Sequence, residues 1–150
     1  MISLYRLSSA KFPANSGDGA AKFGGRWNQV GTPVIYAAQT ASLAALEVLV
    51  HYSVLPRDFV LTEIQVPENL AILRWETAAL PVGWDGEVVI AETQELGDQW
   101  VREGRAALLS VPSSIMPKER NFVINPAHSA FRRIKFLPSA PFVFDSRLKR

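Results

Sequence analysis

The chain of 150 residues contains no cysteine and only two histidines. Without cysteine, disulfide scaffolds, thiolate zinc sites, iron–sulfur clusters and cysteine nucleophiles are all excluded. His51 and His128 do not form a paired-histidine motif, so we expect no metal. No apolar run approaches the roughly 18 residues of a membrane span. The first residues, MISLYRLSSAKF, lack the pattern of a secretory signal, so we expect a soluble cytoplasmic protein.

Charge is nearly balanced, with 16 Lys and Arg against 14 Asp and Glu. The basic excess lies at the C-terminus, where the only acidic residue among the last twenty is Asp145. The basic residues there are Arg132, Arg133, Lys135, Arg147, Lys149 and Arg150. A terminal cluster of this kind is usually a solvated end, and no recognition motif or stacking pattern accompanies it. We therefore expect no direct binding of nucleic acid.

Short apolar runs separated by Gly and Pro favour one α+β domain over residues 1–150, built on a mixed, mainly antiparallel sheet. Strict alternation of strands and helices is absent, so a doubly wound parallel fold is disfavoured. A long loop is expected from residue 8 to residue 25, and a more exposed helix over 91–103 that ends at Gly104. Strands are expected at 2–7, 34–37, 59–66, 70–75, 106–111, 121–124, 131–137 and 142–144.

The segment 41–52, ASLAALEVLVHY, is apolar nearly all round and predicts a buried helix with Thr40 as its N-cap. Glu47 and His51 lie four residues apart and share one stripe of this helix. A carboxylate in such a helix needs a charged or hydrogen-bonding partner. His51 is more simply interpreted as a histidine of the core.

Generic motifs of catalysis and nucleotide binding fail. The stretch GDGAAK at 17–22 has Lys22 where a dinucleotide fingerprint needs its third glycine, and no P-loop spacing is present. Ser113, His128 and Asp145 could be combined into a triad, but no nucleophile-elbow glycines surround any serine.

Two stretches carry more polar and glycine residues than a simple core requires. In FGGRWN at 23–28, paired glycines allow close approach of a ligand, and an arginine suited to diphosphate follows them. In the segment 111–126, prolines fix the path of a polar loop between two strands. Taken singly, each stretch also fits a structural role, as a surface arginine beside a core tryptophan and as a rigid connection.

Taken in chain order, several motifs resemble the RES domain, a family named for an arginine, a glutamate and a serine. The motifs are YRL at 5–7, GGRWN at 24–28, VIYA at 34–37, ALEVLVH at 45–51, VPSS at 111–114 and NFVINPAH at 121–128. The resemblance runs from about residue 2 to residue 140. It implies a core similar to the ADP-ribosyltransferase fold and the role of toxin in a bacterial type II toxin–antitoxin pair. The implied partner is a helix-turn-helix antitoxin of the Xre type that covers the active site.

The resemblance also implies NAD⁺ as the substrate, either degraded by hydrolysis or phosphorolysis or used to ADP-ribosylate a protein. By this resemblance Glu47 is the catalytic glutamate, Arg6 and Arg26 bind the cofactor, and Tyr36 is the active-site tyrosine. Ser113 is the family's serine, although the adjacent Ser114 leaves that assignment open by one residue.

This assignment agrees with the chemistry of the residues. Breaking the bond between nicotinamide and ribose builds positive charge on the ribose, which a fixed carboxylate stabilises. We expect Arg26 and Arg6 to pair with the diphosphate and to give Glu47 cationic neighbours. We expect Tyr36 to stack on nicotinamide or hold the ribose. Ser113 is better suited to donate a hydrogen bond than to act as a nucleophile, because no base is adjacent.

Overall fold

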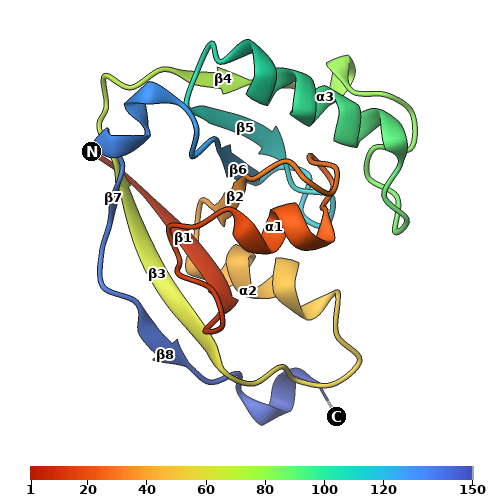
Figure 1. Cartoon of the computed structure of the whole chain (residues 1–150). Coiled ribbons are helices and arrows are strands. Elements are labelled where there is room, and N and C mark those ends of the chain that lie inside the picture. The colour runs from red at the N-terminus through yellow and green to blue at the C-terminus, as the bar shows by residue number, and fades with distance from the viewer. Residues whose placement is uncertain (150) are drawn as a thin grey trace.

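The computed structural model describes residues 1–149, so Arg150 of the basic tail lies outside the described residues. Within the described residues strands predominate, with three α-helices and three short 3₁₀ turns among them. Figure 1 shows how these elements are arranged. In order, the elements are β1 (Ile2–Ser9), α1 (Asp18–Phe23), β2 (Ile35–Ala38), α2 (Ala41–Leu49), β3 (Phe59–Val66), β4 (Ile72–Arg74), η1 (Thr77–Ala79), α3 (Ala91–Glu103), β5 (Leu108–Pro112), β6 (Arg120–Ile124), η2 (Ser129–Arg133), β7 (Lys135–Phe136), β8 (Ala140–Phe142) and η3 (Ser146–Leu148).

The strands form one eight-stranded sheet in the order β4-β5-β6-β2-β1-β3-β7, with β8 also paired to β3. Among residues 1–149, β4 and β5 are the one parallel pair, and the other strand pairs are antiparallel. The predicted α+β fold with a mixed, mainly antiparallel sheet is therefore confirmed. No helix within residues 1–149 has both the length and the apolar character needed to cross a membrane.

The sheet parts between β1 and β2. Strand β1 pairs with β3 along its whole length, from Ile2↔Val66 to Ser9↔Phe59. With β2 it shares only the pair Tyr5↔Ala38. One wing of the sheet therefore consists of β2, β6, β5 and β4, and the other of β1, β3, β7 and β8, as Figure 1 shows. Arg6 follows immediately after the single pair that joins them.

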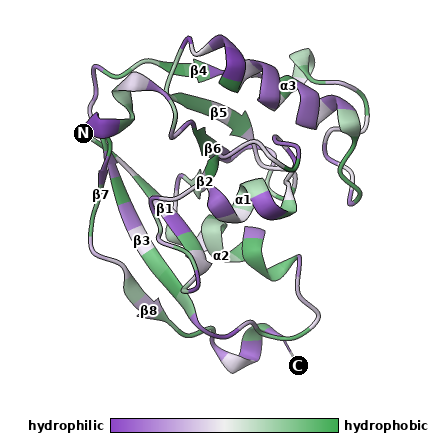
Figure 2. Ribbon diagram, in the orientation of Figure 1, coloured by the Kyte–Doolittle hydropathy of each residue, from purple (hydrophilic) through white to green (hydrophobic). Residues whose placement is uncertain are grey.

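Alternation along the strands gives the sheet two apolar faces. On one face Leu4, Ile35, Leu108 and Ile124 pack together with the aromatic rings that follow β6. The other face carries two clusters, one under α2 and one that contains three buried tryptophans, Trp27, Trp84 and Trp100. Figure 2 shows β5 and β6 as largely hydrophobic and α3 as mostly hydrophilic, in keeping with their central and peripheral positions.

The predicted helix signals act as expected. The Thr40 hydroxyl caps α2 by accepting a hydrogen bond from the Leu43 amide at 3.1 Å. The C-terminus of the second predicted helix, α3, is capped by Gly104, which adopts the left-handed conformation with φ 63°. Both helices therefore have the ends that their sequences indicate.

The prediction that 41–52 forms a buried helix, rather than an amphipathic one at the surface, is wrong. Helix α2 ends at Leu49 and buries one face, which carries Leu43, Ala44 and Leu49. Leu46 is 40% exposed and Val50 is 55% exposed, because nothing within residues 1–149 covers that side of the helix. His51 lies beyond the helix and is exposed, so it is not a core histidine.

Several boundaries differ from the predictions. The expected loop at 8–25 contains the short helix α1. No side chain caps the N-terminus of this helix, so the sequence carries no capping signal for it. The first three residues of the expected strand at 131–137 belong to the 3₁₀ turn η2, and only Lys135–Phe136 pairs as a strand, β7. Near the C-terminus the pairing strand is Ala140–Phe142 rather than 142–144. Strand β5 includes Pro112 as its last residue, and β4 is shorter than 70–75.

Candidate active site

Glu47 on α2 meets two hydrogen-bond donors from the hairpin of β5 and β6. The Ser113 hydroxyl donates to Glu47 Oε1 at 2.7 Å, and the Asn121 amide donates through Nδ2 to the same oxygen at 2.8 Å. Asn121 lies opposite Val111 in β5 and Ala38 in β2, so the sheet register places it beneath α2. The partner that the sequence required for this carboxylate is therefore a pair of neutral donors.

Ser113 is fully buried and organises the turn that follows β5. Its oxygen accepts hydrogen bonds from the amides of Ile115 at 3.1 Å and Met116 at 3.0 Å. Its own amide donates to the Glu119 carbonyl at 2.9 Å and closes the hairpin. No hydrogen bond between Ser114 and Glu47 occurs within residues 1–149, so of the two serines Ser113 is the one that contacts Glu47.

Residues 24–29 form a tight turn that carries Arg26, and we call it the arginine turn. The backbones of Gly25 and Asn28 bond to each other in both directions. The side chain of Asn28 is fully buried and donates to three backbone carbonyls around it. A Cβ at Gly25 would lie 2.8 Å from the Tyr36 hydroxyl, so this position needs glycine for packing.

Tyr36 on β2 fixes the arginine turn to the sheet. Its hydroxyl donates to Asn28 Oδ1 at 2.6 Å and accepts from the Trp27 amide at 3.0 Å. Burial raises the pKa of Tyr36 above its ordinary value of 10.0, so the phenol stays neutral and keeps its donor.

Helix α3 holds the arginine turn from the other side. Gln94 donates through Nε2 to the carbonyls of Gly25 and Asn28, and the Asp98 carboxylate accepts from the Gln29 amide at 3.1 Å. Between these two residues of α3, a Cβ at Gly97 would lie 1.6 Å from the Trp27 carbonyl oxygen. The glycine inside this helix therefore allows direct contact between helix and turn.

The Arg26 guanidinium is bound to the segment between η1 and α3. It donates through Nη1 to the Trp84 carbonyl at 2.6 Å and through Nη2 to the Gly86 carbonyl at 3.0 Å. The fork of the guanidinium thus spans two backbone acceptors, an arrangement that a lysine ammonium cannot reproduce.

Arg6 has more free donor capacity. Its Nη1 donates to the Tyr36 carbonyl at 2.9 Å, which lies where β1 and β2 part. Its Nε is buried and has no partner among the described residues. Burial lowers the pKa of Arg6 to about 10, so the group is still charged at neutral pH. A half-buried cation with unused donors and no carboxylate partner among residues 1–149 is suited to bind an anion.

Comparison with known proteins identifies the family. The sequence profile of the RES domain matches residues 3–145. The chain belongs to the RES domain family. It is 44% identical to the "Prs ADP-ribosylating toxin" of Sphingobium sp. (strain YBL2), over 90% of this chain and 86% of that protein. It is 42% identical to "Toxin Res" of Photorhabdus laumondii subsp. laumondii, over 97% and 96% of the two chains.

A solved structure has the same fold as this RES domain. It is a chain of the M. tuberculosis MbcT–MbcA toxin–antitoxin complex, with a TM-score of 0.70 over 93% of this chain and 83% of that chain. The sequence identity is 22%. The likeness shows that the two chains share an α+β fold, the class expected from the sequence.

The RES domain brings some of the predicted residues together directly. Glu47 contacts Ser113, and the Arg6 side chain contacts the backbone of Tyr36. Tyr36 in turn binds the turn that carries Arg26. The expectation of cationic neighbours for Glu47 is not met by an ion pair within residues 1–149, because Arg26 is bound to backbone carbonyls instead.

Sequence reasoning missed the supporting residues: Asn121, which contacts Glu47, and Asn28, Gln94, Gly97 and Asp98, which hold the arginine turn. One signal was available, since a glycine inside a helix costs about 1 kcal/mol relative to alanine and so indicates close packing. Asn121 had no such signal, because its role depends on strand register. Within residues 1–149 no group of three or more Asp, Glu and His side chains could hold a metal ion.

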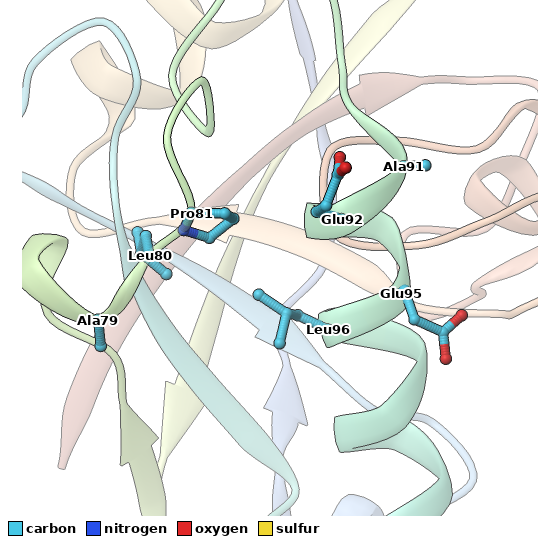
Figure 3. A pocket seen from close by; sticks show the side chains of 7 residues that line it. All are labelled: Ala79, Leu80, Pro81, Ala91, Glu92, Glu95 and Leu96. Carbon is cyan, nitrogen blue, oxygen red and sulfur yellow. The ribbon is translucent and has the colours of Figure 1, made fainter.

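An apolar hollow of about 600 Å³ lies elsewhere, between α3 and the residues that follow η1. Figure 3 shows Leu96 pointing toward Leu80 and Pro81, while the carboxylate of Glu95 points away. None of the predicted site residues lines this hollow. Its apolar walls lack the cations that a dinucleotide requires, so we do not place the active site there.

Proposed function

We propose that this RES domain is the toxin of a type II toxin–antitoxin pair and degrades NAD⁺ in the cytoplasm, which depletes the cell of NAD⁺ and arrests growth. The observation that carries the proposal is the environment of Glu47. Two neutral donors meet one carboxylate oxygen, Oε1, and no group within residues 1–149 donates to Oε2. A carboxylate fixed by one oxygen presents the other to a substrate.

The reaction is cleavage of the bond between nicotinamide and ribose. The bonding electrons leave with nicotinamide, and positive charge develops at the ribose carbon and ring oxygen, as in other glycosidic cleavages. Glu47 stabilises that charge through its own negative charge. Because Ser113 and Asn121 already hold the carboxylate, little reorganisation is needed when the charge develops.

The arginines supply the binding site for the diphosphate. Arg6 carries no salt bridge within residues 1–149, and only its Nη1 makes a hydrogen bond, so its charge is not neutralised by a carboxylate and supports a role in binding phosphate. Arg26 is proposed as the second phosphate-binding cation from the family resemblance, and its guanidinium would have to leave the carbonyls of Trp84 and Gly86 to bind the diphosphate. Tyr36 and Ser113 complete the predicted NAD⁺ site: Tyr36 anchors the turn and Ser113 fixes Glu47.

Two reactions are possible at this site, and they differ in the molecule that accepts ADP-ribose. With water or phosphate as the acceptor, the product is free ADP-ribose or its 1″-phosphate. The second candidate is mono-ADP-ribosylation of a host protein at the same site. The name of the Sphingobium relative, "Prs ADP-ribosylating toxin", favours this second candidate.

We further propose an Xre-type helix-turn-helix antitoxin as the partner, which blocks the site in a hetero-oligomer. The MbcT–MbcA complex, whose toxin–antitoxin assembly includes a chain of this fold, supports a partner of this kind. Operator DNA would then be bound through the antitoxin, not by this chain.

Purified protein without a partner should release nicotinamide from NAD⁺, which chromatography measures directly. Glu47→Gln keeps the shape of the side chain and removes its charge, so we expect release to fall at least about 100-fold. Glu92→Gln, at an exposed position of α3, serves as the matched control and should leave release unchanged. Wild-type release in Glu47→Gln would refute the role of Glu47.

The two acceptors separate in a second experiment with labelled NAD⁺ in a cell lysate. A labelled protein band supports modification of a protein. Free labelled ADP-ribose or its 1″-phosphate supports degradation. Absence of nicotinamide release from the wild-type protein in both settings would overturn the proposal as a whole.

A further inference from the structure

We propose that Asn121 is a positioning residue that determines which oxygen of Glu47 serves the reaction, an inference that rests on the proposed function. The residue is the second of β6, directly after Arg120, which pairs with Pro112 of β5 where the hairpin turn ends. It touches Glu47 through Nδ2 at 2.8 Å, alongside the Ser113 hydroxyl at 2.7 Å.

The direction of both hydrogen bonds is determined by the donors. An amide nitrogen can only donate. Ser113 has one hydroxyl proton, and its oxygen already accepts from the amides of Ile115 and Met116, so its proton goes to Glu47. Oε1 is therefore an acceptor in both contacts and carries no proton. Any proton on this carboxylate, and any contact with the ribose, belongs to Oε2.

The orientation of the Asn121 amide has a cost that supports this role. With Nδ2 directed at Glu47, the amide oxygen Oδ1 is buried and has no partner among residues 1–149. A buried acceptor without a donor is rare in native proteins and usually accompanies a functional constraint. Here the amide gives up one neutral hydrogen bond and keeps the one to a charged group, which is the stronger kind.

Register explains why Asn121 rather than a neighbour takes this position. Asn121 pairs with Ala38 of β2 and Val111 of β5, so its side chain emerges on the sheet face that α2 covers. Ala38 is small and buried directly beside it, which leaves room for Glu47 to reach down from α2. The donor therefore comes from the sheet and the acceptor from the helix.

Asn121→Ala is the first test, and turnover of NAD⁺ under initial-rate conditions is the readout. We expect kcat to fall about 10- to 100-fold, the range of a hydrogen bond to a charged group, with KM for NAD⁺ nearly unchanged. Calorimetric binding of NAD⁺ should likewise be unchanged, because Asn121 acts through Glu47. Lys118→Ala, at an exposed position of the same hairpin, is the matched control and should keep wild-type kcat.

Asn121→Asp separates a donor role from a merely structural one. Aspartate has the shape of asparagine but places a second carboxylate against Oε1, so kcat should be no higher than in Asn121→Ala. A structural role predicts the opposite order, with the isosteric aspartate closer to wild type. Equal kcat in wild type and Asn121→Ala, or a higher kcat in Asn121→Asp than in Asn121→Ala, would overturn the assignment.

The same experiments distinguish failure of this inference from failure of the proposed function. If wild-type protein neither binds nor cleaves NAD⁺, the proposed function fails and the assignment of Asn121 falls with it. If wild type cleaves NAD⁺ and the Asn121 variants behave like wild type, only the assignment of Asn121 fails. Thermal unfolding of each variant shows whether loss of kcat follows from loss of the fold.

Discussion

The two sides of the candidate site are built in different ways. On the glutamate side, one hairpin supplies both donors to Glu47 and leaves Oε2 without a protein partner. On the arginine side, the Arg26 guanidinium is engaged by the carbonyls of Trp84 and Gly86, while Arg6 keeps a buried donor unused. The Glu47 carboxylate thus keeps one oxygen without a hydrogen bond from the described residues, whereas the Arg26 guanidinium is already bound to backbone carbonyls.

The two sides are also held in place by different parts of the fold. The glutamate side depends on strand register, since Asn121 and Ser113 are positioned by β5 and β6. The arginine turn lies outside any strand and depends on α3, Tyr36 and the buried Asn28 side chain. Mutations that disturb helix packing should therefore affect the arginine side and spare the glutamate side.

The largest loss of stability is expected from Gly97→Ala, a substitution that disturbs the arginine side and leaves the contacts of Glu47 in place. The added Cβ would lie 1.6 Å from the Trp27 carbonyl oxygen, so α3 and the turn must separate. Overpacking of this kind costs typically ~1–3 kcal/mol. Because a backbone atom is in the way here, we expect the free energy of unfolding, measured by urea denaturation, to drop by at least about 3 kcal/mol.

Gly19→Ala in α1 is the control for Gly97→Ala. Its Cβ would lie 3.6 Å from the Phe12 ring, an ordinary contact, and alanine favours helix by about 1 kcal/mol over glycine. Its stability should equal or exceed that of wild type. Equal stability of Gly97→Ala and wild type would contradict the close contact between helix and turn.

Tyr36→Phe should have the next largest effect and a pH signature. Removal of the hydroxyl leaves Asn28 Oδ1 and the Trp27 amide without their partner, a loss of roughly 1–3 kcal/mol. The pKa of Tyr36 is raised by burial, so above pH 10 the unfolded chain loses this proton while the native state keeps it. Stability of the wild type must therefore fall as the pH rises through that region.

The difference in unfolding free energy between wild type and Tyr36→Phe isolates the contribution of the Tyr36 proton. Tyr36→Phe cannot lose a proton at residue 36, so its deficit relative to wild type should shrink between pH 9 and about pH 11. The contribution of Arg6 is present in both proteins and cancels. Denaturation curves at each pH provide the measurement, and a constant difference across the range would show that Tyr36 ionises normally.

Much of the fold could be predicted because it rests on local signals. Thr40 and Gly104 mark helix ends by capping chemistry that acts within a few residues. Alternation predicts β1 and β3, whose side chains face two sides of one sheet. Helix α1 and the 3₁₀ turn η2 lack such signals, and the burial of α2 depends on what the rest of the chain places against it.

The site was predictable in its members but not in its contacts. Glu47 stood out because a carboxylate in an apolar helix needs a partner. The identity of that partner follows from the register of β5, β6 and β2, which no local pattern encodes. For the same reason the sequence suggested a cation beside Glu47, where the structure has Ser113 and Asn121.

Arg26→Lys is expected to have the smallest effect on stability. It also tests most directly whether the arginine side and the glutamate side are held independently. Arginine spans the carbonyls of Trp84 and Gly86, whereas a lysine ammonium is a point charge that bonds one of them at a time. Loss of one such bond, which involves a charged group, costs about 1.5 kcal/mol when lysine keeps the other. Hydrogen exchange should therefore quicken in residues 81–90 and stay unchanged in the hairpin that holds Glu47.

Arg102→Lys is the matched control, because Arg102 pairs with Glu95 on the exposed side of α3. It should leave exchange in residues 81–90 at the wild-type rate. If Arg26→Lys quickens exchange around Ser113 and Asn121 as well, the two sides of the site are mechanically coupled, contrary to the separation argued above. Exchange confined to residues 81–90 would show that the segment depends on Arg26 while the glutamate side keeps its own support.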